Sequence, residues 1–391
     1  MPVRTIRAAL TAVLLGSAMT GAAVMTMAGP AQALTVSAKV GPLLNEAKAL
    51  YAQGNYNGAL ANAGNYRGAM AKVNEAESAP GKTGDDAAVI AKMKKFIAVK
   101  SGDVSIGGTV AAKAKFANDY NAGKYKEVIA DGDILRKAGA LDGQSQLLIA
   151  QAYYKSGDNA GCVRYAKTLE GNETALQLQA RCAYETGDEA TQRSALEQLV
   201  ARNPKPEYWS DLLKLGERAR GLSDHNSLDL YRLRMLTGSM GNKDDYVALA
   251  QYAMQLGCAA EAQSVLEKGV AAKVVTDDRS MRLLAVAKQQ AAANLANESK
   301  ATAAANAAPQ GDDLVKVGEN MIGEGKAKDA IGVIQSGMKK PLKDANNAQI
   351  RLGEAYLAAG QKSEAEAAFN KVKTPEKDAL VAHLWALAAR H

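Results

Sequence analysis

The sequence predicts an all-α protein built from repeated pairs of helices. Hydrophobic residues make up 47% of the 391 residues but aromatic residues only 5%, so alanine and leucine must supply most of the packing. Such a composition favours helices, of roughly 10 to 16 residues, over strands. From residue 144 to 188, an amphipathic run ending in YYKSGD is followed by a second run and then by a third ending in AYETGD. The chain therefore repeats a two-helix unit.

Glycines mark the predicted turn inside each helix pair. Successive marker glycines are separated by 34, 30, 34, 36, 68 and 35 residues, and the longest step is twice 34. The markers are Gly123, Gly157, Gly187, Gly221, Gly257, Gly325 and Gly360, with Gly54 at an earlier turn. The midpoint of the long step, Ala291, lies in an alanine-rich segment that we expect to form a degenerate pair. This period predicts a helical solenoid of about eight pairs with caps.

The two ends of the array depart from the regular unit. After the first marker, GNYNGALANA is followed directly by GNYRGAMAKV, a duplication that we expect to lengthen one helix. The loop SAPGKTGDD, the helix VIAKMKKFIAVKSGD and the connection VSIGG come next, and Pro375 begins a final helix that can cover the last pair. The predicted segments are a signal at 1–33, an irregular cap at 34–108, a central array at 109–308 and a C-terminal array with its capping helix at 309–391.

Small residues recur at one position in each helix of the pair, where two backbones can approach closely. They are Ala47, Ala150, Ala180, Ala250, Gly318 and Gly353 in first helices, and Ala59, Cys162, Ala262, Ala330 and Ala365 in second helices. This pattern resembles the tetratricopeptide repeat family, most clearly in RLGEAYLAAGQKSEAEAAFNKV, residues 351–372. The resemblance covers about Pro42 to Val372. It implies a right-handed superhelix of helical hairpins that binds other proteins.

Several positions depart from the family pattern. The tryptophan of the family's first helix is absent, and Phe116 and Lys214 stand where a small residue is expected. Val128, Gln192 and Asn226 occupy positions where alanine is expected. We expect these copies to pack less regularly than the others.

The first 33 residues have the features of a secretory signal. Two arginines precede an uncharged stretch at residues 8–28, and a Gly-Pro break leads into the triplet Ala31-Gln32-Ala33. The stretch is long enough for a retained membrane anchor, but its Ala, Gly and Thr content and the break favour cleavage. The sequence thus predicts a bacterial periplasmic protein that begins near Leu34 and has no stable membrane insertion after cleavage.

No motif of a catalytic or metal site is recognisable. The three histidines, His225, His383 and His391, have no partner at metal-ligand spacing. GKTGDD, at residues 81–86, lacks the preceding strand and the full spacing of a phosphate loop and is interpreted as a turn. The charge of +7, without an arginine cluster, does not indicate nucleic acid. We predict no enzyme activity, no metal, no cofactor and no nucleic-acid partner.

The three cysteines allow two interpretations. Cys162 begins a second helix and Cys182 lies in the next first helix, and neighbouring helices touch in such an array. In an oxidising compartment these two can form a disulfide, with Cys258 free and buried. Alternatively, all three are small core residues.

A column of tyrosines is the candidate binding surface. Tyr51, Tyr120, Tyr154 and Tyr184 each stand three residues before a turn glycine, and Arg218, Met254, Ile322 and Leu357 take this position in later copies. The resemblance implies that first helices line a concave groove into which this position points. Gln151 and Arg181 flank the column on the same helices. Tyrosine is favoured at binding surfaces, although the rings can instead pack between repeats.

These features predict an exported scaffold or adaptor that binds a protein or peptide of the cell envelope in its groove. An alternative is an enzyme or accessory subunit that acts on cell-wall glycan. An enzyme of this kind needs a compact catalytic domain, and the repeats leave no segment to form one.

Overall fold

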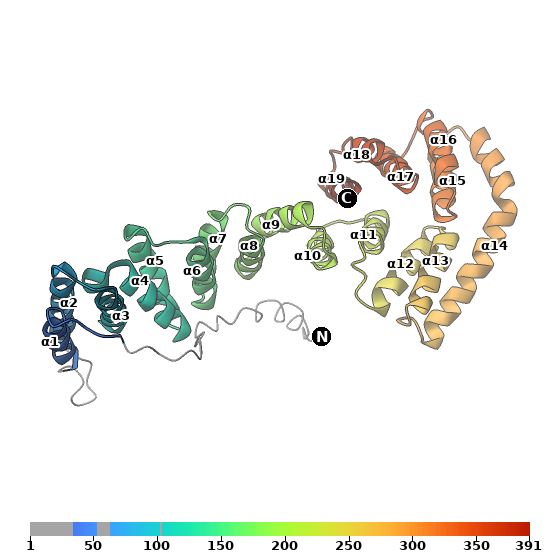
Figure 1. Ribbon diagram of the computed structural model, residues 1–391. Helices are drawn as coiled ribbons and strands as arrows, with labels where there is room; N and C mark the ends of the chain where they lie inside the picture. Colours follow the sequence, from blue (N-terminus) through green and yellow to red (C-terminus); the bar gives the residue numbers. More distant parts are fainter. Residues whose placement is uncertain (1–33, 53–62, 102–103) are drawn as a thin grey trace. The chain divides into compact units, whose positions relative to one another are not determined.

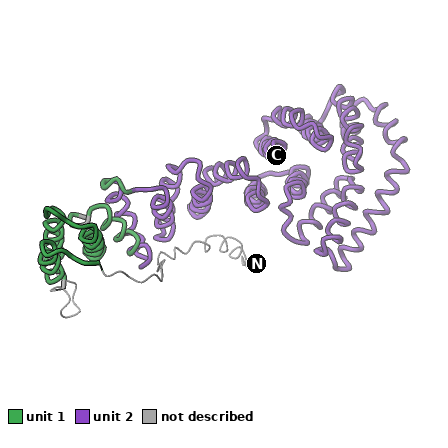
Figure 2. The backbone as a smooth tube through the Cα atoms, viewed as in Figure 1, with its two compact units in different colours: residues 1–118, 137–140 green, residues 119–136, 141–391 purple. Residues whose placement is uncertain are grey.

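The computed structural model describes residues 34–52, 63–101 and 104–391, which form nineteen helices and no strand. The predicted all-α class is confirmed. The chain divides into unit 1, residues 1–118 and 137–140, and unit 2, residues 119–136 and 141–391 (Figure 2). The predicted signal segment and the first copy of the local duplication, with Gly54 and Ala59, lie outside the described residues.

Unit 1 contains three helices and most of a fourth (Figure 1), and an apolar core joins the three helices to Ala111 of the fourth. The helices are α1 (Gly41–Ala52), α2 (Ala63–Ser78), α3 (Gly84–Ser101) and α4 (Val104–Asn121). The GKTGDD turn caps α3, because the Thr83 backbone N–H donates to Asp86 Oδ2 at 2.9 Å and the Asp86 N–H donates to Thr83 Oγ1 at 3.1 Å.

The expectation that VSIGG is a connection was wrong. Val104 begins α4, and the element is broken at Gly108, whose φ of 55° and ψ of −138° are not helical. Glycine tolerates this backbone conformation because it has no Cβ. The segment therefore forms a helical turn before the kink.

Unit 2 consists mainly of consecutive helical hairpins, linked by short turns (Figure 1). After α5 (Tyr125–Lys137) come α6 (Gly143–Lys155) with α7 (Asn159–Lys167), α8 (Glu173–Thr186) with α9 (Glu189–Arg202), α10 (Pro206–Gly216) with α11 (Asp224–Leu236), and α12 (Lys243–Gln255) with α13 (Ala259–Ala271). A single helix, α14 (Asp278–Ala307), precedes α15 (Asp312–Gly323) with α16 (Ala327–Met338), α17 (Ala345–Ala358) with α18 (Lys362–Phe369), and α19 (Glu376–Ala389).

In two of the hairpins, a Gly-Asp dipeptide forms the turn between the helices. All seven marker glycines from residue 123 onward have a positive φ, between 72° and 83°, which favours glycine. After two of them, an aspartate caps the next helix: Asp158 accepts from the Gly161 N–H at 2.8 Å, and Asp188 accepts from the Thr191 N–H at 3.0 Å. One dipeptide thus ends one helix and starts the next.

The predicted helix pair around Ala291 does not exist. Residues 278–307 form one helix of 30 residues, far longer than the expected 10 to 16, while α7 and α18 are shorter, with 9 and 8 residues. The segment contains no glycine or proline, and alanine is the strongest helix former, so nothing interrupts the helix. The spacing of the marker glycines predicted a helix pair here, but the segment has no turn residue that could separate two helices.

Close backbone approach explains the small residues, with a register shift in one copy. A Cβ at Gly353 would lie 2.4 Å from the Phe369 ring, so only glycine fits there. Lys214, at the expected small position of α10, is exposed instead. Gly216 takes the close position, where a Cβ would lie 3.3 Å from Leu384. The register shifts because the turn between α10 and α11 is longer than in the other hairpins.

The last helix does more than cover the last hairpin. α19 contacts α18, α17 and α11, and the Trp385 ring stacks on Phe369 with centroids 5.6 Å apart. Its residues belong to the same apolar core as those of α10. The stretch from α10 to α19 therefore closes on itself. No helix within the described residues is both long and apolar enough to cross a membrane.

Candidate partner-binding surface

Three of the four predicted tyrosines form a regular row in unit 2. Each tyrosine meets a polar side chain of the next copy, in α6, in α8 or just after α10. Tyr120 Oη donates to Gln151 Oε1 at 2.6 Å. The Arg181 guanidinium carbon lies 5.9 Å from the centre of the Tyr154 ring, and that of Arg218 lies 5.5 Å from the centre of the Tyr184 ring. We call these six residues the tyrosine row.

Helix geometry explains why the contacts repeat. Gln151 precedes Tyr154 by three residues, and Arg181 precedes Tyr184 by three, so each pair shares one face of its helix. One member contacts the previous copy while the other contacts the next. A cation over a tyrosine ring contributes about 0.5 to 1 kcal/mol at an exposed site. The row is therefore a continuous surface feature with modest stabilising value.

Exposure increases along the row toward α10. Tyr120 and Tyr154 are half-buried, whereas Tyr184 is 42% exposed and Arg218 is exposed. Burial, followed by the neighbouring Tyr125, raises the pKa of Tyr120 above its usual value. A ligand can thus reach the Tyr184 and Arg218 pair most directly.

The remaining predicted tyrosine has different surroundings. Tyr51 lies in unit 1, where its ring contacts Phe96 at a centroid distance of 5.2 Å and packs against the apolar core. The structure therefore describes Tyr51 as a packing residue and not as a member of the row.

The row ends at Arg218. This residue follows the end of α10 instead of lying on it, contrary to the expectation that its position belongs to a first helix. In later copies the equivalent residues, Met254, Ile322 and Leu357, are partly buried against apolar clusters. Beyond α10, the position serves packing.

A disulfide supports the middle of the row. Cys162 at the start of α7 and Cys182 in α8 are bonded, with a Cα–Cα distance of 6.1 Å. Both are buried in a small cluster against which Tyr154 packs. The pair named from the sequence thus joins two neighbouring hairpins directly beneath a tyrosine of the row.

A second polar feature, a buried charge cluster, was not predicted from the sequence. It joins four helices through Asp229 and Arg232 of α11, Glu261 of α13, Glu319 of α15, and Arg351 and Glu354 of α17.

The two arginines organise the charge cluster. Arg232 lies 2.6 Å from Glu261 and 3.0 Å from Glu319. Arg351, which is fully buried, lies 3.0 Å from Glu319 and 2.8 Å from Glu354, and it also pairs with Asp229. Every carboxylate therefore contacts at least one guanidinium group, which is what burial of charge requires.

Carboxylates outnumber the arginines in the cluster, and their pKa values differ. Burial raises the pKa of Asp229 to about 7 and also raises that of Glu354. Burial opposes ionisation of Glu319 as well, but the charges of Arg232 and Lys316 outweigh it and lower its pKa to about 2. Asp229 and Glu354 are therefore the groups that take up protons in the folded state.

The sequence contained a signal for this cluster. Opposite charges stand three residues apart in Asp229 and Arg232 and again in Arg351 and Glu354. Glu319 and Glu354 directly follow Gly318 and Gly353, the small residues assigned to buried positions. Both carboxylates therefore stand next to positions that were predicted to pack closely.

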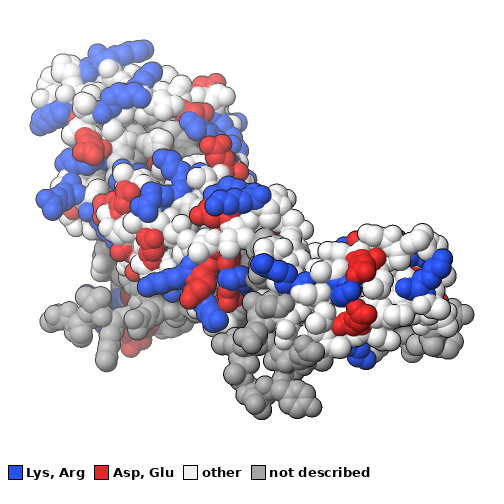
Figure 3. Space-filling model, turned by 90° about the vertical axis from the view of Figure 1, so that its left-hand side faces the viewer, with Lys and Arg blue, Asp and Glu red and all other residues white. Residues whose placement is uncertain are grey.

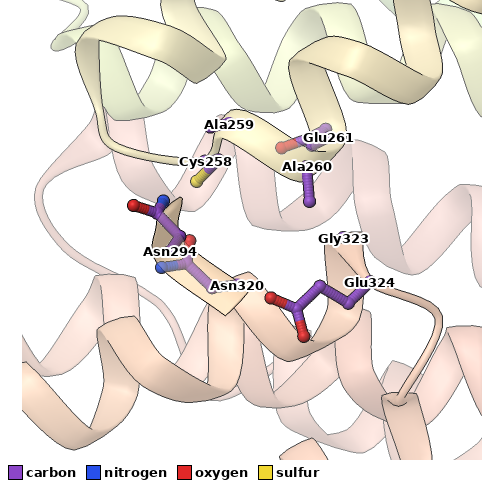
Figure 4. A pocket seen from close by; sticks show the side chains of 8 residues that line it. All are labelled: Cys258, Ala259, Ala260, Glu261, Asn294, Asn320, Gly323 and Glu324. Atoms are coloured by element: carbon purple, nitrogen blue, oxygen red, sulfur yellow. The ribbon is translucent and has the colours of Figure 1, made fainter. Parts of the chain in front are cut away.

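Cys258 adjoins the cluster but has no reactive surroundings. Burial, followed by the charge of Glu319, raises its pKa to about 12, although Lys316 Nζ lies 2.9 Å from the sulfur. The hollow beside it measures only about 10 Å³, as Figure 4 shows with its lining residues. That is room for about one water molecule. A substrate cannot reach this thiol.

In the part of the chain that the structure describes, no group of His, Cys, Asp and Glu residues has an arrangement that could hold a metal ion. A shallow hollow of about 620 Å³ lies between α12 and the start of α14. Basic and acidic side chains are interspersed on the face shown in Figure 3.

One segment of the chain matches a known family. Residues 347–374 match the tetratricopeptide repeat, and they contain the whole of the copy that was clearest in the sequence, residues 351–372. This match confirms the resemblance in that copy. No curated protein is detectably similar to the chain in sequence.

The similar solved structures share little sequence with this chain and have low TM-scores. The chain is similar to a tetratricopeptide repeat protein from Parabacteroides merdae ATCC 43184, with 13% identity and a TM-score of 0.30 over 72% of this chain and 98% of that one. It is also similar to the P58(IPK) TPR domain, with 16% identity and a TM-score of 0.21 over 90% and 98% of the two chains. At these values neither similarity says what this chain binds.

Proposed function

We propose that this protein is an exported scaffold that binds a protein or peptide of the bacterial cell envelope through the tyrosine row. A repeat array of helical hairpins supports the scaffold role, because such arrays present extended surfaces to partners. The signal-like features of residues 1–33 support export to the periplasm.

The observation that carries the proposal is the exposed end of the row. Tyr184 is 42% exposed although it is a large aromatic residue, and the Arg218 guanidinium lies over its ring. Tyrosine and arginine are the residue types that dominate the energetics of protein interfaces. Their side chains are already ordered by contact with each other, which lowers the entropic cost of binding.

The chemistry of the row fits a polypeptide ligand. The tyrosine hydroxyls can donate to backbone carbonyls, the rings offer apolar area, and Arg181 and Arg218 can donate to carbonyls or carboxylates. The repeat spacing would place successive contacts along an extended or helical segment.

Site-specific photo-crosslinking tests the proposal. A photoreactive phenylalanine analogue at position 184 should crosslink to an envelope protein in living cells. The same replacement at Gln198, exposed on α9, is the matched control and should give no such product. Crosslinks at 198 but not at 184 would refute the assignment of the row. Recovery of the protein on purified cell wall, unchanged by Tyr184→Ala, would favour a glycan-binding role instead.

Export needs its own test. A C-terminally tagged chain should appear in the periplasmic fraction, shortened at its N-terminus, and deletion of residues 2–33 should keep it in the cytoplasm. A full-length product in the membrane fraction would show a retained anchor.

A further inference from the structure

The net positive charge of the chain is concentrated at one end. Residues 34–118 contain eleven Lys and Arg against six Asp and Glu, a net charge of +5. Residues 119–391 contain 35 of each, a net charge of zero. All excess charge outside the signal-like segment therefore lies in residues 34–118, which form most of unit 1.

Helix α3 gathers part of this charge on one face. Lys92, Lys95, Phe96 and Lys100 follow the spacing i, i+3, i+4 and i+8, which places them along one side of the helix. All four are exposed, and Lys100 Nζ lies 5.9 Å from the centre of the Phe96 ring. Residues such as Ile97 on the opposite side are buried in the core of unit 1. We call the exposed residues the α3 basic face.

The lysines of this face are not neutralised by neighbours. Lys94, between them in sequence, pairs with Glu77 at 2.5 Å, and Lys72 on α2 pairs with Glu46 and Glu75. In contrast, Lys92, Lys95 and Lys100 form no ion pair with any described residue. Unit 1 thus pairs its inward lysines and leaves this outward set free to attract an anionic partner.

We infer that unit 1 binds an anionic lipid surface through the α3 basic face. Ten of the eleven basic residues in 34–118 are lysines, and Arg67 is the exception. Lysine acts as a point charge suited to diffuse attraction, whereas recognition of a carboxylate in a protein favours the planar fork of arginine.

Two further observations favour a membrane over an acidic protein. The face is the exposed side of a helix and presents a row of side chains to the surroundings. Phe96 stands among the lysines with 42% of its surface exposed, and an aromatic ring with flanking lysines suits the boundary between headgroups and acyl chains. This contact is peripheral and adds a tether to the scaffold, whose tyrosine row lies in unit 2.

Vesicle co-sedimentation tests this inference. The purified protein should bind vesicles of equal parts phosphatidylglycerol and phosphatidylcholine, and binding should weaken strongly as salt screens the charges. Vesicles of phosphatidylcholine alone should not bind it. The triple variant K92E/K95E/K100E should bind on the order of a hundredfold more weakly, because each lysine contributes to attraction by an anionic surface.

A matched variant separates this face from net charge. K339E/K371E/K373E reverses three exposed lysines of unit 2 and changes the net charge equally, so its binding should stay near that of the unaltered protein. Circular dichroism and thermal unfolding establish that both variants fold. Equal losses in the two variants, or equal binding to neutral vesicles, would overturn the inference.

One outcome points to another partner. If the protein ignores anionic vesicles but binds polyglutamate through Lys92, Lys95 and Lys100, the face serves an acidic polypeptide and the lipid inference is wrong. The crosslinking result at position 184 is independent of all these outcomes, so the proposed function stands or falls separately.

Discussion

Two stretches of unit 2 hold their helices together in different ways. In α6 to α9, neighbouring copies are joined by the tyrosine row at the surface and by one disulfide beneath it. In α10 to α19, Arg351 pairs with Asp229 across 122 residues of sequence, and α19 packs on α11. The first stretch behaves as a linear array with contacts between neighbours. The second is closed, so its helices should unfold together.

The two stretches are suited to different roles. A linear stretch leaves its repeated side chains accessible, as Tyr184 and Arg218 are, and suits binding. In the closed stretch, polar groups pair with each other inside the protein, since Arg351 and Glu319 are almost completely buried. Each of the following changes should affect one stretch more than the other. The two tryptophans, Trp209 and Trp385, both lie in the closed stretch. Their core also includes residues of α8 and α9, so their fluorescence reports mainly on the closed stretch.

The largest expected effect is the loss of Arg351. Arg351→Ala leaves Asp229, Glu319 and Glu354 with fewer cationic partners in a buried site, and removing one partner of a buried ion pair costs about 3 to 5 kcal/mol. Urea unfolding followed by tryptophan fluorescence measures the change. Arg390→Ala, which breaks a half-exposed pair with Glu366, is the control and should cost roughly 0 to 1 kcal/mol. Equal effects would mean that the cluster does not stabilise the closed stretch.

The second effect belongs to the linear stretch. Replacing Cys162 and Cys182 by serine removes a link between residues 20 apart, which should lower the stability of α6 to α9 by about 3 kcal/mol. Hydrogen exchange of these helices should rise while the tryptophan signal in urea changes little. A parallel shift of the tryptophan transition would show that the two stretches unfold as one.

The two stretches differ in how much of their structure the sequence determines locally. The turn glycines, their positive φ values and the small residues at close contacts follow from local backbone geometry, so the hairpins were predictable. The contact between Asp229 and Arg351 was not, because closure depends on the summed angles of several hairpins. The missing pair at Ala291 shows the same limit, since a period says nothing where turn residues are absent. For the tyrosine row, the positions followed from spacing, but the different surroundings of Tyr51 did not.

The third prediction uses pH to distinguish the stretches. The pKa of Asp229 is raised from 3.8 to about 7 on folding because the carboxyl is buried. The folded state therefore binds the extra proton, and this stabilisation is present below pH 4 and is lost as pH rises through about 7. The free energy of unfolding of the closed stretch should fall by up to about 1.4 kcal/mol per pH unit in that window.

The linear stretch should not share this dependence between pH 5 and pH 8. In that stretch, hydrogen bonds from Thr191 lower the pKa of Asp188 below its ordinary value of 3.8. The stability that this carboxylate contributes is therefore present above the ordinary pKa and is lost only in more acidic solution. Urea unfolding at pH 5 and pH 8, read from the tryptophans, should show a less stable closed stretch at pH 8. A more stable closed stretch at pH 8 would mean that another group controls its titration.

The smallest effect on stability, and the most informative for function, concerns the tyrosine row. Tyr184→Ala removes an exposed ring and one contact with Arg218, so it should cost less than about 1 kcal/mol. Tyr154→Ala removes a half-buried ring from the disulfide cluster and should cost more, about 2 kcal/mol. If the row binds a partner, capture of that partner in cells should be lost in Tyr184→Ala while the fold persists. Tyr184→Phe keeps the ring and separates stacking from hydrogen bonding by the hydroxyl. Should Tyr184→Ala destabilise α6 to α9 as much as Tyr154→Ala and leave partner capture unchanged, the row would be a packing device, and the linear stretch would need another surface for binding.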